Sequence, residues 1–149
     1  MKLRFAHYFF GFVLLAGGLT AIAEENKVDP LSDPAYKELI ASFDKSKDCI
    51  FSRTINDWTA LDDQRLIVYA PTKKRPYYIK LVQRSLELKF AHTIGVHSRF
   101  DNRICPYGGN ALFIDGERYT ISAIQKLDED TAKQLLQYQR QKKETKQKQ

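Results

Sequence analysis

Two apolar runs on either side of a basic turn form the clearest pattern in the chain. The run Leu66–Ala70 is rich in branched and aromatic residues, a composition that predicts a β-strand. The run Tyr77–Leu81 has the same character and predicts the returning strand. Between them, Pro71–Pro76 holds three basic side chains between two prolines, which cannot donate to a strand ladder. The pattern predicts a β-hairpin with a basic tip.

A second hairpin is predicted around an Asp-Gly pair. Asp115 and Gly116 suit a two-residue type I′ loop, because both positions of that loop require positive φ. The flanking runs Ala111–Ile114 and Glu117–Ile121 would then be its strands. This register places Leu112 opposite Tyr119 on a face that is suited to the core.

One helix is predicted before the strands. Asp33 can cap its N-terminus, and Pro34 fits the first helical position. An apolar stripe follows at helical spacing, formed by Tyr36, Leu39, Ile40 and Phe43. We interpret the stripe as core packing rather than as a partner site.

A last helix is predicted to begin at the acidic residues Asp128–Asp130, which complement the helix dipole. Ala132, Leu135 and Leu136 form its apolar side. From Gln137 onward the chain is rich in Gln and Lys and has no aliphatic residue. We expect a solvated helix end there that frays into disorder and is dispensable for folding.

The remaining segments are short. Cys49–Phe51, Ala91–His97 and Arg103–Cys105 predict further strands, and Ser85–Phe90 predicts a short helix or an irregular crossing. Ile55–Leu61 predicts a short helical turn that seats Trp58, the only tryptophan, in the core. The alternative role for Trp58 is a stacking platform for a sugar or a base.

These elements predict a mainly β fold. Five to six antiparallel strands would form a curled sheet or a small open barrel, with one flanking helix at each end. The alternative is an α+β two-layer fold with both helices on one sheet face. The predicted segments are a signal peptide (1–23), a polar lead-in with the first helix (24–48), a disulfide-stapled β domain (49–127), and a C-terminal helix with a basic tail (128–149).

The N-terminus has the pattern of a secretory signal. Lys2 and Arg4 precede the largely apolar run Phe5–Ala21, and Ala21–Ala23 fits the small-x-small cleavage rule. We expect a periplasmic or secreted protein, cleaved near Ala23. The alternative is an uncleaved inner-membrane anchor, because the run is nearly long enough to span a bilayer.

The charge distribution divides the chain in two. The net charge of +6 falls to +4 after cleavage, of which the segment 133–149 carries +5 and the body 24–132 carries −1. A nearly neutral body argues against a basic nucleic-acid-binding face, so we expect no nucleic-acid partner.

The two cysteines are predicted to form a disulfide. An even pair in an exported chain is usually oxidised, and Cys49 and Cys105 close a loop of 57 residues counting both ends. The chain-entropy model assigns roughly 4 kcal/mol to such a loop. The alternative, a catalytic thiol or redox pair, lacks a C-x-x-C motif.

The chain offers few motifs for chemistry. It has no glycine-rich phosphate loop, G-x-S-x-G elbow or H-E-x-x-H sequence. Asp62, Asp63 and His97 are candidate acid/base groups, although a polar turn explains the two aspartates. His92 and His97 would point to opposite faces of one strand, so we expect neither a metal site nor a cofactor.

The candidate binding surface lies at the loop tips. Lys73, Lys74 and Arg75 form the basic tip of the first hairpin, and Arg99 and Arg103 flank another turn. We consider both groups as anion contacts, with ordinary solvated turns as the alternative.

Several short motifs together resemble a known family. They are Cys49–Phe51 (C-I-F), Leu61 and Asp62 (L-D), Leu66–Tyr69, Tyr77–Leu81, and Arg103–Cys105 (R-I-C). Over about residues 49–127 the chain is similar to a family of small exported proteobacterial proteins catalogued as a domain of unknown function. The resemblance implies an envelope location and no established activity.

Two functions follow as expectations. The first is a non-catalytic periplasmic module that binds an envelope protein or an anionic envelope component. The second is an enzyme acting on envelope material through carboxylate and histidine groups.

Overall fold

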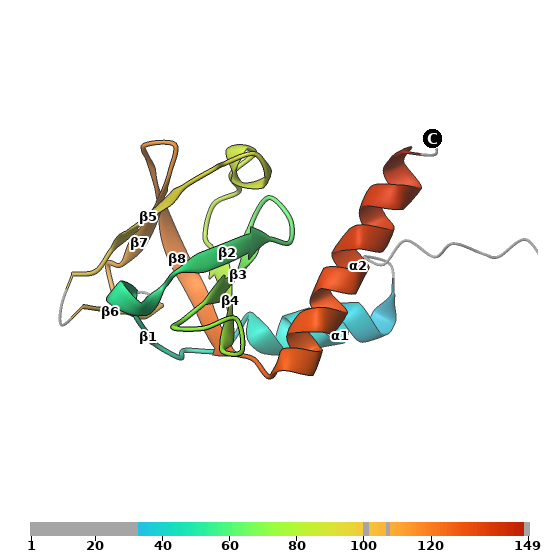
Figure 1. The fold of residues 1–149 in the computed structure, drawn as a ribbon, viewed down its shortest axis with the longest axis horizontal. Helices are drawn as coiled ribbons and strands as arrows, with labels where there is room; N and C mark the ends of the chain where they lie inside the picture. The colour runs from blue at the N-terminus through green and yellow to red at the C-terminus, as the bar shows by residue number, and fades with distance from the viewer. Residues whose placement is uncertain (1–32, 100–101, 107, 148–149) are drawn as a thin grey trace, which may run out of the picture.

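The computed structural model describes residues 33–99, 102–106 and 108–147, apart from the side chains of residues 145 and 146. The predicted signal peptide and the lead-in as far as residue 32 lie outside this range. None of the described helices is both long and apolar enough to cross a membrane. In chain order the elements are α1 (Pro34–Phe43), β1 (Ile50–Phe51), the 3₁₀ turn η1 (Ser52–Thr54), β2 (Asp57–Ala60), β3 (Arg65–Tyr69), β4 (Pro76–Leu81), the 3₁₀ turn η2 (Glu87–Lys89), β5 (Ile94–His97), β6 (Arg103–Ile104), β7 (Ala111–Ile114), β8 (Glu117–Lys126) and α2 (Glu129–Gln147) (Figure 1).

Six antiparallel strands form one sheet in the order β2-β3-β4-β8-β7-β5, and the sheet curls into a half-barrel (Figure 1). The long strand β8 makes the curl possible, because it pairs with β4 along one half and with β7 along the other. The register between β4 and β8 shifts between Lys80 and Leu81, and such a bulge bends a strand. The predicted mainly β fold is confirmed.

Both predicted hairpins are confirmed. Strands β3 and β4 pair around the basic turn, with Val68 opposite Tyr77. Strands β7 and β8 pair with Leu112 opposite Tyr119, as the type I′ loop required. In that loop Asp115 and Gly116 have φ of 49° and 87°.

The predicted disulfide is also confirmed. Cys49 and Cys105 are bonded with a Cα–Cα distance of 4.5 Å. Cys49 directly precedes β1 and Cys105 directly follows β6, and these two strands form a separate two-stranded sheet. The bond therefore closes the end of the smaller sheet.

The helical turn predicted around Trp58 is wrong. Residues 57–60 form the edge strand β2, in which Trp58 lies opposite Val68 and Ala60 opposite Leu66. The helical turn lies earlier, at η1. Pairing with β3 decides the conformation here, and this contact is invisible in the local sequence. In contrast, the short helix predicted within 85–90 is present as η2.

The sheet buries a different cluster on each face. The concave face holds the larger cluster, which includes Leu66, Val68, Ile79, Leu112 and Ile121. The outer face is covered by both helices: Tyr36 and Ile40 from α1 and Ala132 and Leu135 from α2 pack with Ile67 and Tyr78. Both helices thus lie on one sheet face, as in the α+β alternative, although the molecule is mainly β.

The predicted solvated end from Gln137 is wrong for the turn that follows it. Helix α2 continues to Gln147. The ring of Tyr138 lies 4.8 Å from that of Tyr36, and its hydroxyl donates to Asp33. Gln139 donates to the backbone carbonyl of Ala60 in β2. This turn is therefore part of the folded body.

Candidate functional site

The sequence-predicted basic loops lie on separate elements. Lys73, in the turn between β3 and β4, is 81% exposed and pairs with Asp57 at 3.2 Å. Arg103 belongs to the small sheet, where its guanidinium lies 5.2 Å from the centre of the Phe51 ring. The backbone N–H of Arg99 donates to Asn110 Oδ1 at 3.0 Å. Lys74 and Arg75 are exposed in the same turn as Lys73. These are the contacts of individual surface groups.

The candidate acid/base residues have structural contacts. Asp62 is buried, accepts the N–H groups of Gln64 and Arg65, and pairs with the Arg65 guanidinium at 3.1 Å. Asp63 faces Arg84 at 3.8 Å. These contacts support the interpretation of a polar turn.

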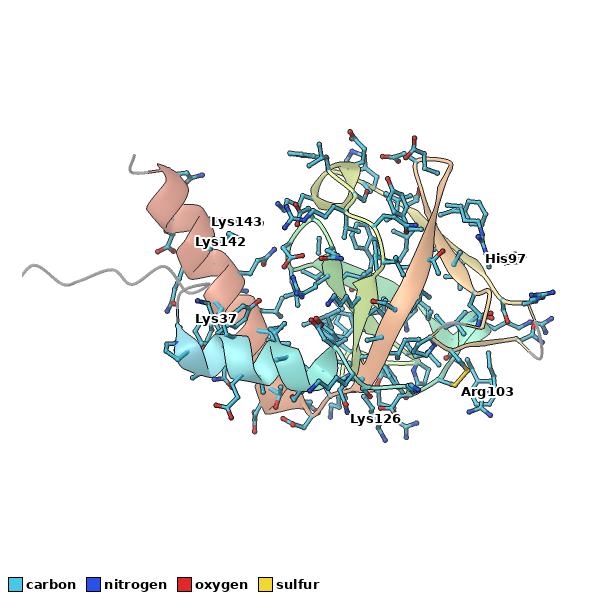
Figure 2. The ribbon with its side chains drawn as sticks, turned by 180° about the vertical axis from the view of Figure 1, so that it is seen from behind. Lys37, His97, Arg103, Lys126, Lys142 and Lys143 are labelled. Atoms are coloured by element: carbon cyan, nitrogen blue, oxygen red, sulfur yellow. A yellow bond between two sulfur atoms is a disulfide. The ribbon has the colours of Figure 1, made fainter. Side chains whose placement is uncertain are left out.

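His97 lies apart, on the edge strand β5, with its ring edge-on to Phe113 at 6.3 Å (Figure 2). Among the described residues no group of three or more His, Cys, Asp or Glu side chains could hold a metal ion.

A groove lies between the edge strand β2 and the C-terminal half of α2, with a volume of about 500 Å³. Figure 1 shows α2 leaning away from the half-barrel toward its C-terminus. Its chemically distinctive lining residues are Trp58, Lys89, His92, Gln139, Lys142 and Lys143. Three separate parts of the chain therefore meet in one cavity.

The walls of the groove are fixed by packing. The first turns of α2 are anchored to the sheet by Ala132 and Leu135, which are 4% and 0% exposed. The Gln139 carboxamide then joins the helix to Ala60 of β2. Beyond this contact Lys142 and Lys143 form the groove wall on the helix side (Figure 2).

The edge of β2 is partly blocked against further strand pairing. The N–H of Trp58 donates to the Asp57 carboxylate at 2.8 Å, and the carbonyl of Ala60 accepts from Gln139. Natural proteins block sheet edges in this way to prevent unwanted strand addition. The groove is therefore suited to a ligand that contacts the side chains of the protein rather than one that adds a strand to β2.

The charge of the groove is positive. Lys89 contributes from η2, and Lys142 and Lys143 contribute from α2. The acidic side chain in the lining, Asp57, is already paired with Lys73. Trp58 is half-buried and packs against the concave cluster, so it supplies an aromatic wall. The groove thus combines cations with an apolar surface.

A polar cluster on the sheet face that carries both helices holds α1 in place. Asp44, which follows α1, accepts from the Tyr78 hydroxyl at 2.6 Å, from Lys80 at 2.6 Å and from Arg65 at 3.3 Å. Burial alone would raise the pKa of Asp44, but the hydrogen bonds from Lys80 and Tyr78 bring it below its ordinary value. Burial, then the charge of Asp62, raises the pKa of Tyr36 to about 12. The cluster is structural.

The groove has no sign in the local sequence, because it depends on pairing between distant segments. In the sequence, Lys142 and Lys143 appear only as part of a basic tail. His92 appears only as a possible metal ligand. Lys89 lies in the segment Ser85–Phe90, for which the sequence predicts either a short helix or an irregular crossing. The sequence feature that could indicate the groove is Tyr138. It is a lone aromatic residue in the tail, and such a ring favours packing of the tail against the body.

Comparison with known protein families gives one match. A family model described as "Family of unknown function (DUF6491)" covers residues 1–143. The chain belongs to this family. The match includes every lining residue of the groove, the last of which is Lys143. Comparisons with curated proteins and with solved structures gave no match.

Proposed function

We propose that this member of the family is a non-catalytic, exported module that binds an anionic component of the cell envelope in the groove. The observation that carries the proposal is the meeting of Lys89, Lys142 and Lys143 around Trp58. Ammonium groups from two elements attract a phosphate or carboxylate, and the indole ring offers apolar surface to the rest of the ligand.

The groove chemistry supports binding rather than catalysis. A catalytic site needs a nucleophile or general base held within hydrogen-bond reach of its partner. Asp57 is instead shared between the Trp58 N–H and Lys73. The Gln139 carboxamide is already engaged with Ala60. The lining also holds the ammonium groups of Lys89, Lys142 and Lys143, which are suited to attracting an anion.

The proposed location is the periplasm, and the N-terminal charge and hydropathy pattern supports it. The Cys49–Cys105 disulfide agrees with an oxidising compartment. We expect the protein from an envelope fraction to begin at Glu24, which intact-mass measurement would establish. A mass that retains residues 1–23 would instead indicate a membrane anchor.

The binding proposal is tested through Trp58, the chain's only tryptophan. Glycerophosphoglycerol, a soluble phosphodiester headgroup, is titrated into residues 24–149 while Trp58 fluorescence is recorded. We expect a saturable change that weakens with added salt, because the attraction is Coulombic. Chloride of the same ionic strength serves as the reference anion.

A pair of matched variants locates the site. Lys142→Gln with Lys143→Gln should weaken binding about tenfold, which corresponds to about 1.4 kcal/mol of lost attraction. Lys74→Gln with Arg75→Gln removes the same charge from the β3–β4 turn, keeps the Lys73–Asp57 pair, and should leave binding unchanged. Equal losses in both variants, or no fluorescence change with the unmodified protein, would refute the groove as the site.

A further inference from the structure

The segment between β4 and β5 exposes an unusual amount of apolar surface. The large apolar side chains that are exposed among the described residues are Phe51, Val82, Leu86 and Phe90. Three of these four belong to the segment 82–90. Leu86 and Phe90 are each 74% exposed, which is a high fraction for two side chains so close in sequence.

This exposure is held in place by the fold. Between the two exposed residues, Leu88 is completely buried in the concave cluster. The N–H of Ser85 donates to the backbone carbonyl of Asp63 at 2.6 Å. The N–H of Phe90 donates to the backbone carbonyl of Glu87 at 2.8 Å. The turn η2 therefore presents Leu86 and Phe90 from a rigid base.

The exposed pair adjoins the basic groove. Lys89 lies immediately before Phe90 in the chain and lines the groove together with Lys142 and Lys143. Figure 1 shows η2, the yellow-green turn, at the same upper end of the molecule as the C-terminal half of α2. Of the acidic side chains, Glu87 belongs to η2 itself, Asp63 faces Arg84, and Asp57 of the groove is paired with Lys73. The surface as a whole is apolar with a cationic border.

We propose that this end of the molecule docks on a bilayer that contains anionic phospholipid. Leu86 and Phe90 enter the interfacial region, while Lys89, Lys142 and Lys143 contact the headgroup phosphates. Apolar side chains beside cations are the combination that binds peripheral proteins to anionic membranes. The inference rests on the proposed function and specifies its ligand, because a soluble anion would leave Leu86 and Phe90 without a role.

The test is co-sedimentation of residues 24–149 with vesicles, which removes the predicted apolar leader from the measurement. Vesicles of phosphatidylethanolamine with phosphatidylglycerol are compared with vesicles of phosphatidylcholine alone. We expect binding to the anionic vesicles only. Leu86→Ser with Phe90→Ser should lower this binding about tenfold or more, since each change removes an apolar anchor. Phe51→Ser, which removes an exposed aromatic ring from β1, should have no effect.

A second measurement follows insertion directly and does not depend on a loss of binding. Phe90→Trp places an indole at the proposed contact, and lipids brominated along their acyl chains quench fluorescence that lies near the apolar core. We expect stronger quenching in this variant than in the unmodified protein. Equal quenching in the two would overturn the docking proposal.

The outcomes separate this inference from the proposed function. If Leu86→Ser with Phe90→Ser binds vesicles normally, the docking proposal fails. If glycerophosphoglycerol still changes Trp58 fluorescence, and this change still depends on Lys142 and Lys143, the anion groove is supported without the membrane contact. A protein that binds neither the soluble headgroup nor the vesicles contradicts both proposals.

Discussion

At the scale of single residues, Asp44 joins three side chains outside the groove. Its carboxylate receives hydrogen bonds from Tyr78, Lys80 and Arg65, and its pKa is lowered as a result. A group whose pKa is lower in the folded state stabilises the fold above its unfolded value, about 3.8. That contribution is lost as the pH falls through the folded value. We therefore expect part of the acid sensitivity of this protein to come from Asp44.

The change Asp44→Asn tests this expectation. At pH 7 we expect a loss of about 1–3 kcal/mol in the free energy of unfolding, because Tyr78 and Lys80 lose a charged acceptor. Urea unfolding at pH 7 and below pH 4 should show a smaller pH effect in the variant than in the unmodified protein. Asp130→Asn, which affects an exposed pair with Lys133, is the matched control. Equal pH effects in Asp44→Asn and the unmodified protein would contradict the assignment.

Ser85 differs from Asp44 in the hydrogen bonding of its side chain. Its hydroxyl is buried and has no hydrogen-bond partner among the described residues. Removing an unsatisfied hydroxyl releases its desolvation cost, so Ser85→Ala should be neutral or stabilising by about 1 kcal/mol. Urea midpoints provide the measurement. Ser52→Ala is the control, because the Ser52 hydroxyl donates to the carbonyl of Asn102. A loss in Ser85→Ala as large as that in Ser52→Ala would mean that the hydroxyl has a partner.

At the scale of elements, helix α2 has two parts. One part is anchored to the body, and the other is the C-terminal end after Lys143. Truncation after Leu136 removes the stacked ring of Tyr138 and the Gln139 contact with β2. We expect a loss of about 2 kcal/mol or more. Truncation after Lys143 keeps both contacts and should change stability by less than about 0.5 kcal/mol. The two proteins are compared by urea unfolding, and equal stabilities would show that the tail is dispensable, as the sequence predicted.

The elements also show which features a sequence can predict. The hairpins at 66–81 and 111–121 follow from local turn chemistry, so the sequence predicts even the register of the second. Strand β2 depends on pairing with β3, and a short segment gives no local sign of that. Tyr138 is the only aromatic or aliphatic residue after Leu136, so the sequence predicts a solvated helix turn there. The groove unites residues 79 positions apart, as in the Ala60–Gln139 contact, and no local pattern could indicate it.

At the scale of the whole molecule, one covalent bond joins the residue before β1 to the residue after β6 in the small sheet. Cys49 and Cys105 are 56 positions apart. Thiol titration of denatured, unreduced protein should find no free thiol. Cys49→Ser with Cys105→Ser should lower the free energy of unfolding by about 2–4 kcal/mol, since the unfolded chain regains conformational freedom. Two titratable thiols in protein taken from the envelope would contradict the assignment.

The whole molecule is also asymmetric in charge and apolar surface. Its body carries a net charge of −1, yet lysines from η2 and α2 meet at one groove, and exposed Leu86 and Phe90 lie beside it. Such an arrangement orients the molecule toward an anionic partner even though the overall body is nearly neutral. The central claim is therefore the position of the anion site.

The most direct test of that claim is to map amide chemical shifts in ¹⁵N-labelled residues 24–149 during titration with glycerophosphoglycerol. The account predicts that the largest changes occur on both walls of the groove, at Trp58, Lys89 and Gln139, and follow one saturation curve. Changes confined to the β3–β4 turn around Lys73, or to Arg99 and Arg103, would place the site at the loop tips. That result would contradict the groove.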